Sequence, residues 1–128
     1  MKLLTADQIF GADDMRFEDV PTPEWGEGTG IRVRRLSGPE RRAYELSTNP
    51  SDTEFDLRTA LVAACACDEN FKPLFTREQA KRLAEKSALP IVRAFAACDR
   101  INGLGYTASE DAEKKSPSPE VGNDSASN

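Results

Sequence analysis

The 128 residues include 17 Lys and Arg, 22 Asp and Glu, three Cys and no His, and 38% of them are apolar. This length suits one domain of ~100–150 residues, and the apolar share is low for a chain that folds from end to end. Because imidazole is absent, Ser-His and Cys-His catalysis and zinc sites with His ligands are excluded. The net charge of −5 disfavours general binding of nucleic acid, because phosphates repel it.

Membrane, secretory and disulfide-rich classes are also disfavoured. The longest uncharged stretch rich in apolar residues, Thr59 to Cys67, is far shorter than the ~20 residues of a membrane helix. Acidic residues from Asp7 onward interrupt the apolar start of the chain, which a signal peptide would keep free of charge. Three cysteines without a framework spacing suit a reducing cytosol.

Charge is distributed unevenly along the chain. Residues 1–27 carry seven acids and two bases (−5), residues 28–42 carry five Arg and one Glu (+4), and residues 106–128 carry five acids and two bases (−3). Two interpretations stay open. The opposite charges pair across the strands of a hairpin, or they complement the charge of a partner or another subunit and steer association.

The first 36 residues predict a short helix and a β-hairpin. Thr5-Ala6-Asp7-Gln8 has the spacing of a capping box, which opens a helix. In Ile31–Leu36, apolar and Arg side chains alternate as in a half-buried strand. The glycine-rich segment 26–30 precedes a strand and lacks the Lys-Ser/Thr of a P-loop, so a hairpin turn is favoured over a phosphate site. The predicted elements are a helix over 6–11 and strands over 16–20 and 31–36.

The rest of the chain predicts helices followed by a disordered tail. The helix expected near 53–66 has apolar residues nearly all round, so it is expected to be the central one. The last helix carries the clearest apolar stripe and stops at Asn102-Gly103. The fold class is therefore α+β, mostly α: a folded domain over 1–105 with an N-terminal hairpin and about four helices, then a disordered acidic Ser/Pro-rich tail over 106–128. The helices are expected near 38–47, 53–66, 77–86 and 87–102.

No catalytic, metal-binding or cofactor-binding residue is predicted, and the chain is expected not to be an enzyme. On a helix, the thiols of Cys65 and Cys67 would project ~200° apart and could not share a metal ion. Burial as small apolar residues is therefore favoured for Cys65, Cys67 and Cys98, with a redox role as the alternative. No two carboxylates adjoin in a setting that would raise the pKa of one of them.

The helices over 77–86 and 87–102 leave a helix-turn-helix reading open. Pro90 and the pair Ile91-Val92 occupy positions where a recognition helix presents base-reading side chains, so ordinary helix packing is favoured. Five basic residues there are candidates for phosphate contacts: Lys81, Arg82, Lys86, Arg93 and Arg100.

Trp25 is the most informative single residue. Beside prolines and glycines, it is either a packing anchor over the hairpin or an exposed contact for a partner, where Trp is enriched.

A series of motifs, each weak alone, occurs in a recognisable order. It comprises Pro23-Glu24-Trp25-Gly26, Arg32-Val33-Arg34, Leu36–Arg41, Leu61-Val62-Ala63, Cys67-Asp68-Glu69, Pro73–Thr76, Leu83–Ser87, Arg100–Leu104 and Glu113–Ser116. Over about residues 5–116 this series resembles the tail assembly chaperones of long-tailed bacteriophages and prophages.

The resemblance implies a small α-rich protein of the host bacterial cytoplasm that is absent from the mature virion. It implies that the protein binds and solubilises the tape measure protein and helps to recruit tail-tube subunits. Such genes commonly carry a ribosomal frameshift, so a longer form of the chain is a further expected partner, and Lys114-Lys115 is the candidate slippery region. Alternatives are a connector or minor tail protein, and a small acidic regulator. Self-association is also expected, and the candidate partner contacts are Trp25, Arg32, Arg34 and Arg42.

Overall fold

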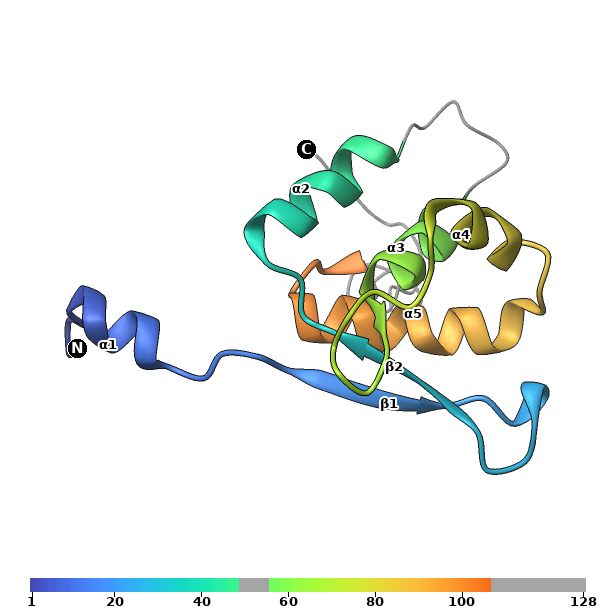
Figure 1. Ribbon diagram of the computed structural model, residues 1–128, viewed down its shortest axis with the longest axis horizontal. Coiled ribbons are helices and arrows are strands. Elements are labelled where there is room, and N and C mark those ends of the chain that lie inside the picture. The colour runs from blue at the N-terminus through green and yellow to red at the C-terminus, as the bar shows by residue number, and fades with distance from the viewer. Residues whose placement is uncertain (49–55, 107–128) are drawn as a thin grey trace, which may run out of the picture.

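The computed structural model describes residues 1–48 and 56–106, which form a mostly α-helical α+β domain (Figure 1). This confirms the predicted fold class. The elements of the described residues follow in the order α1 (Ala6–Gly11), β1 (Phe17–Pro21), the 3-10 turn η1 (Pro23–Trp25), β2 (Gly30–Arg34), α2 (Gly38–Ser47), α3 (Leu57–Cys65), β3 (Ala66–Cys67), α4 (Arg77–Leu83) and α5 (Ala88–Asn102).

The predicted hairpin is confirmed, with each strand placed within two residues of its expected bounds. β1 and β2 are antiparallel, in a register that runs from Phe17 opposite Arg34 to Pro21 opposite Gly30. A Cβ atom at Gly30 would lie 2.9 Å from the carbonyl oxygen of Val20. The two backbones therefore approach more closely there than any residue with a side chain allows.

The third strand was not predicted, and it shortens the central helix. Ala66, expected to end that helix, has extended backbone (φ −63°, ψ 134°). Ala66 and Cys67 pair with Val33 and Arg32 and so add a third strand to the sheet. Cys67 therefore lies on a strand rather than on one helix with Cys65, because tertiary pairing with β2 prevails over the local helical pattern.

Side-chain caps fix where the helices begin. Complete capping boxes, formed by Thr5 with Gln8, Ser37 with Glu40 and Thr76 with Gln79, open α1, α2 and α4. The start expected near Thr53 lies outside the described residues, and the helix begins at Leu57. The cap there is Asp56, whose carboxylate accepts the Thr59 N–H at 2.8 Å. α4 ends at Leu83, earlier than expected, because residues 84–86 form turns that bond back to α4.

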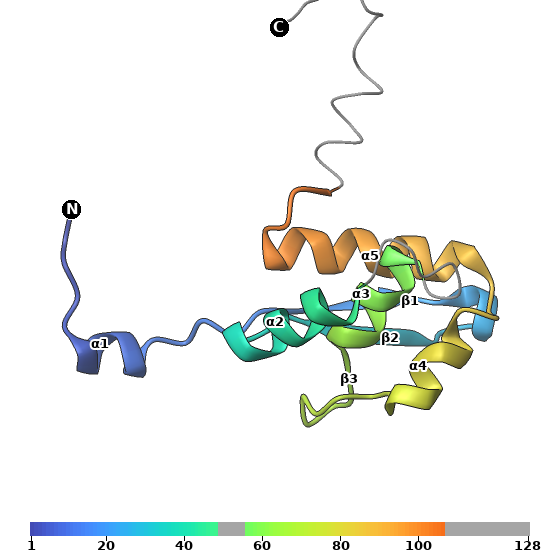
Figure 2. The same cartoon turned by 90° about the horizontal axis from the view of Figure 1, so that it is seen from above.

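The core lies between the hairpin and the helices, with α3 at its centre. α3 contacts α2, α4, α5 and β2, as expected for the most buried helix, and α5 packs across β1 and β2 (Figures 1 and 2). Inward-facing side chains of the hairpin meet those of both helices. The core includes Val20, Ile31, Val33, Leu61, Val62, Cys65, Ile91, Phe95 and Cys98.

The two ends of the described chain differ. Residues 1–11 form an arm that stands clear of the body (Figures 1 and 2). At the other end, Gly103 stops α5 in the left-handed conformation (φ 63°), and the ring of Tyr106 stacks on Phe95 with centroids 5.9 Å apart. Tyr106, the first residue assigned to the tail, thus packs on the domain, while residues 107–128 lie outside the described residues. Across the described ranges, no helix combines the length and the apolar character that crossing a bilayer demands.

Candidate protein-interaction surfaces

The arginine side chains of β2 are largely engaged in contacts within the chain. Arg32 forms a cross-strand ion pair with Asp19 through bonds of 2.6 and 2.9 Å. Its guanidinium also lies over the rings of Phe17 and Phe71, at 4.4 and 5.4 Å from their centroids. Hydrogen bonding to Arg32 lowers the pKa of Asp19. The cross-strand interpretation of the charge pattern is therefore confirmed for this pair.

Arg34 is even less available to a partner. It is only 6% exposed, and its guanidinium donates two hydrogen bonds to Glu40, of 2.9 and 2.6 Å. The same carboxylate accepts the Ser37 N–H at 2.8 Å and so completes the cap of α2. Bonding to Arg34 lowers the pKa of Glu40 to about 2. Arg34 therefore fastens the start of α2 to the sheet.

Two acids of the N-terminal region pair with the last helix, which the sequence pattern did not indicate. Arg100 reaches Glu18 at 2.6 Å, and Arg93 reaches Glu24 at 2.8 Å. Arg93 also donates to the carbonyl of Pro21 at 2.7 Å. The hairpin and α5 are thus joined at both ends by charged contacts.

The ion pairs of α5 also test the hypothesis that α4 and α5 form a helix-turn-helix. α5, which would have to be the recognition helix, has much of its surface buried, including Ile91, Ala94 and Phe95. Of the five basic residues considered for phosphate contacts, Arg93 and Arg100 are bonded to acids of the hairpin. The arrangement favours ordinary helix packing over a nucleic-acid interface.

Trp25 and Arg42 are the candidate contacts that remain open to solvent. Trp25, on η1, is 37% exposed, and Arg42 is exposed on α2. η1 lies at the end of the hairpin far from α2, so the structure does not bring these residues together (Figure 1). The four predicted residues therefore do not form one site.

Two further exposed apolar residues lie on α5, the helix that η1 contacts. The Arg93–Glu24 pair holds η1 against the first half of α5, where Leu89 and Val92 are 66% and 46% exposed. Residues three apart share one face of a helix, so these two side chains point the same way. We call Trp25, Leu89 and Val92 the distal patch, since it lies at the end of the molecule opposite the arm (Figure 1).

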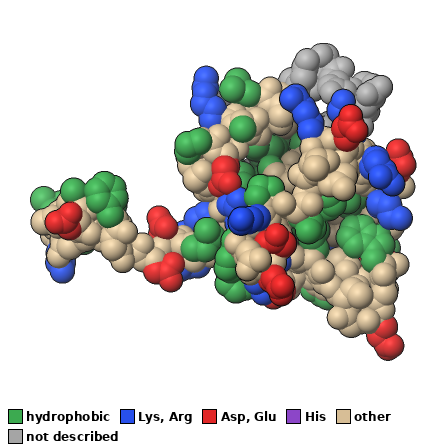
Figure 3. Space-filling view, viewed as in Figure 1, with side chains coloured by type: hydrophobic (Ala, Val, Ile, Leu, Met, Phe, Trp, Pro, Cys, Tyr) green, Lys and Arg blue, Asp and Glu red, His purple; other side chains and the backbone are tan. Residues whose placement is uncertain are grey.

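A second apolar surface is a groove between α2, α3 and α4 with a volume of about 430 Å³. Figure 3 shows hydrophobic side chains at the bottom of this hollow. The Ala-rich face of α3 was the only signal of it in the sequence, because the groove exists only where three helices meet. Its apolar lining includes Ala43, Tyr44, Ala60, Ala63, Ala64, Phe75 and Ala80.

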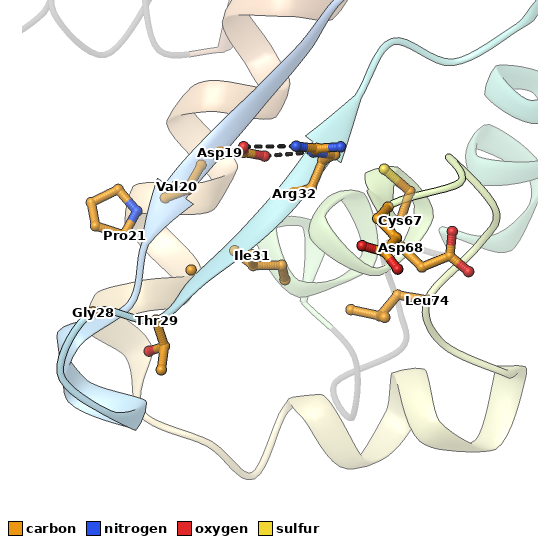
Figure 4. Close-up of a pocket in the computed structure, with 12 residues that line it drawn as sticks. Asp19, Val20, Pro21, Gly28, Thr29, Ile31, Arg32, Cys67, Asp68 and Leu74 are labelled. Carbon is orange, nitrogen blue, oxygen red and sulfur yellow. Dashed lines mark hydrogen bonds and ion pairs between the residues drawn. The ribbon is translucent and has the colours of Figure 1, made fainter.

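A third hollow, of about 540 Å³, lies between the hairpin and the loop after β3 (Figure 4). The Asp19–Arg32 pair lies on one side, with Cys67, Asp68 and Leu74 across from it. Asp68 accepts the backbone N–H groups of Asn70 and Lys72, so its carboxylate shapes the loop. Among the described residues, no group of three His, Cys, Asp or Glu side chains is arranged to hold a metal ion.

The three thiols are buried and free. Burial raises the pKa of Cys67, and bonding to Cys65 together with burial raises the pKa of Cys98 well above its usual range. A raised pKa keeps a thiol protonated and unreactive. Packing is the role that these surroundings favour for both residues.

Similarity to known proteins lies in the fold. No protein-family model and no curated protein matches the sequence. A solved structure described as the bacteriophage HK97 tail assembly chaperone matches with a TM-score of 0.50 and 21% identity, over 73% of this chain and 89% of that chain. The chain has the fold of this phage chaperone. The resemblance noted in the sequence is therefore confirmed at the level of the fold, and function has to be argued from the surfaces.

Proposed function

We propose that the chain is a non-catalytic tail assembly chaperone of a long-tailed phage. It binds and solubilises the tape measure protein and brings tail-tube subunits to it in the cytoplasm of the host bacterium, and it is left out of the finished virion. The single observation that carries this proposal is the fold shared with the HK97 tail assembly chaperone.

The distal patch supplies the client-binding surface in this proposal. Trp25, Leu89 and Val92 offer exposed apolar area where η1 meets α5. Apolar faces of a long amphipathic client helix would be shielded there by mass action, with no nucleotide turnover. The exposed Arg42 would favour encounter with an acidic client.

Co-expression tests the proposal. The tape measure protein of the same phage is produced with and without the full chain, and its soluble fraction is measured after centrifugation. We expect the soluble fraction to fall when the chain is omitted and a tail-tube subunit to be retained on the tape measure protein only when the chain is present. A tape measure protein that is equally soluble in both cases would contradict the proposal.

Mass spectrometry of purified virions separates this function from that of a connector or minor tail protein. A chaperone is expected to be missing from the particle, whereas a structural component is present in fixed copy number. The frameshifted longer form is a further proposed partner. Lys114 and Lys115 lie outside the described residues, so the nucleotide sequence at these codons is the direct test.

A further inference from the structure

The second strand of the hairpin has an open edge on the side away from β1. The N–H of Thr22 donates to the carbonyl of Thr29 at 3.0 Å, and bonded pairs of an antiparallel ladder recur at every second residue. Gly30 is out of that phase, so its N–H and C=O groups point away from β1. Among the described residues, β3 faces β2 only at Arg32 and Val33. The backbone groups of Gly30 therefore have no strand opposite them.

The loop after β3 turns away from β2 and is held in that position. Asp68 accepts the N–H groups of Asn70 and Lys72 at 2.8 and 3.1 Å. Phe71 has a φ of 64°, which is uncommon for a residue with a side chain, and its ring packs against Phe17 with centroids 5.2 Å apart. These contacts fix the loop, so the chain does not close the edge of β2 itself.

The hollow of about 540 Å³ between the hairpin and this loop lies along the open edge. Figure 4 shows Thr29 and Ile31 on the strand side, with Asp68 and Leu74 across from them. Leu74 is 43% exposed and gives the far wall an apolar side chain. A strand that is added to a sheet edge gains main-chain hydrogen bonds, while its alternate side chains enter the pockets beside it. The hollow therefore suits an extended peptide segment.

Charge indicates what kind of segment fits. The hollow is lined by the acids Asp19, Asp68 and Glu69 and by one base, Arg32. Arg32 already pairs with Asp19 at 2.6 Å, and Glu69 is exposed. The negative charge that remains favours Lys or Arg side chains in an occupant. It disfavours edge-to-edge pairing with a second copy, because that pairing would bring two sets of acids together.

We propose that the open edge of β2, over residues 28–31, binds an extended basic segment of another protein. The segment adds a strand on the same side of β2 as β3, with main-chain hydrogen bonds to Gly30 and with Lys or Arg side chains near Asp68 and Glu69. Main-chain bonds supply affinity in this mode of recognition, and the alternate side chains supply specificity. This surface is separate from the distal patch, so its occupation does not depend on the tape measure protein.

Fluorescence anisotropy with the full chain tests the proposal. The probe is a labelled eight-residue peptide in which Lys and Val alternate, and we expect it to bind saturably at one site. The matched probe has the same side chains but is N-methylated at every backbone nitrogen, so it keeps its charge and cannot donate hydrogen bonds. We expect the methylated peptide to bind roughly tenfold more weakly or worse.

A pair of charge reversals tests the surface of the protein. Glu69→Lys changes an exposed acid of the hollow, and Glu85→Lys changes an exposed acid after α4 as the matched control. We expect Glu69→Lys to raise the dissociation constant of the Lys-Val peptide roughly fivefold or more, and Glu85→Lys to leave it within about twofold of the wild-type value. Circular dichroism checks that both variants are folded.

Amide hydrogen exchange, followed by NMR, locates the contact on the strand. In the free chain, the N–H of Gly30 should exchange fast, whereas that of Ile31, which faces β1, should be protected. Bound Lys-Val peptide should slow the exchange of Gly30. Absence of saturable binding, equal binding of the methylated peptide, or an unchanged exchange rate of Gly30 in the complex would overturn the proposal. A Gly30 amide that is already protected in the free chain would do the same, because the edge would then be closed.

Discussion

Arg34 and Glu40 are joined by two hydrogen bonds of 2.9 and 2.6 Å, and Glu40 at the same time closes the cap of α2 on Ser37. One carboxylate thus holds a buried cation and orients the first turn of a helix. Because the guanidinium of Arg34 is nearly inaccessible to water, loss of its counter-charge leaves a cation that solvent cannot readily compensate.

Glu40→Gln removes the negative charge from this contact and keeps the capping interaction, because Gln can also serve in a capping box. We expect the free energy of unfolding in urea to fall by about 1–3 kcal/mol, a range that allows for the partly exposed Glu40 side chain. Glu45→Gln, in the exposed pair with Arg41 at 3.7 Å, is the matched control and should change it by less than ~0.5 kcal/mol. Equal effects of both changes would show that the Arg34–Glu40 pair stabilises the fold no more than the exposed Arg41–Glu45 pair does.

The same carboxylate makes stability depend on pH. Its pKa is about 2 in the folded chain against 4.5 ordinarily, so the unfolded chain binds more protons between these values. Its contribution is therefore complete above about pH 4.5 and is lost as pH falls toward 2. Urea unfolding across this range should show the gap between wild type and Glu40→Gln closing as the solution is acidified. A difference in unfolding free energy that stays constant with pH would contradict the lowered pKa of Glu40.

The close approach of backbones at Gly30 predicts a steric effect. Gly30→Ala places a Cβ atom 2.9 Å from the Val20 carbonyl oxygen, and backbone atoms cannot yield without opening the hairpin. We expect the free energy of unfolding to fall by about 1–3 kcal/mol. Gly38→Ala, where a Cβ would meet nothing within 4 Å, is the control and should leave the melting temperature near that of the wild type.

Thiol reactivity reports on the buried cysteines. Because Cys67 and Cys98 are buried with raised pKa values, we expect a thiol reagent at neutral pH to label the native protein very slowly and the urea-unfolded protein at once. Labelling in intermediate urea should follow the unfolding curve measured by circular dichroism. Rapid labelling of either residue in the native state would support the alternative of a redox role.

The distal patch predicts a surface-specific loss of client binding. Leu89→Asp adds a charge where the proposal places an apolar contact, so less tape measure protein should stay soluble in the co-expression assay. Leu46→Asp, at an exposed leucine of α2 outside the patch, should leave that amount unchanged. Circular dichroism of both variants confirms that each is folded. If both variants behave like wild type, the client binds elsewhere.

Local signals in the sequence were sufficient for most of the fold. The helices expected to start at residues 6, 38 and 77 do start there, each behind a capping box begun by Thr5, Ser37 or Thr76. The alternation in 31–34 placed β2, although Arg34, on the face opposite Ile31 and Val33, is buried. These features depend only on residues a few positions apart, so the sequence displays them directly.

The features that were not predicted all depend on contacts between distant segments. β3 has two residues and exists only through pairing with β2, so no local pattern marks it. Arg34 is buried because Glu40 comes from the next element to meet it. Glu18 and Arg100 are 82 positions apart, and nothing in the spacing of charges indicates which distant acid and base will meet. The groove is likewise a property of three helices together.

The position of α5 as the last element of the described residues sets the order in which their core can be completed during translation. The hairpin leaves the ribosome long before α5, yet α5 supplies a large part of the cover for the face of the sheet that holds Ile31 and Val33. A nascent chain interrupted before residue 88 therefore leaves part of an apolar strand uncovered and open to aggregation. Once Tyr106 has been made, every described core residue is present. A change of reading frame after that point would alter what is attached to the domain while leaving the residues of the core the same.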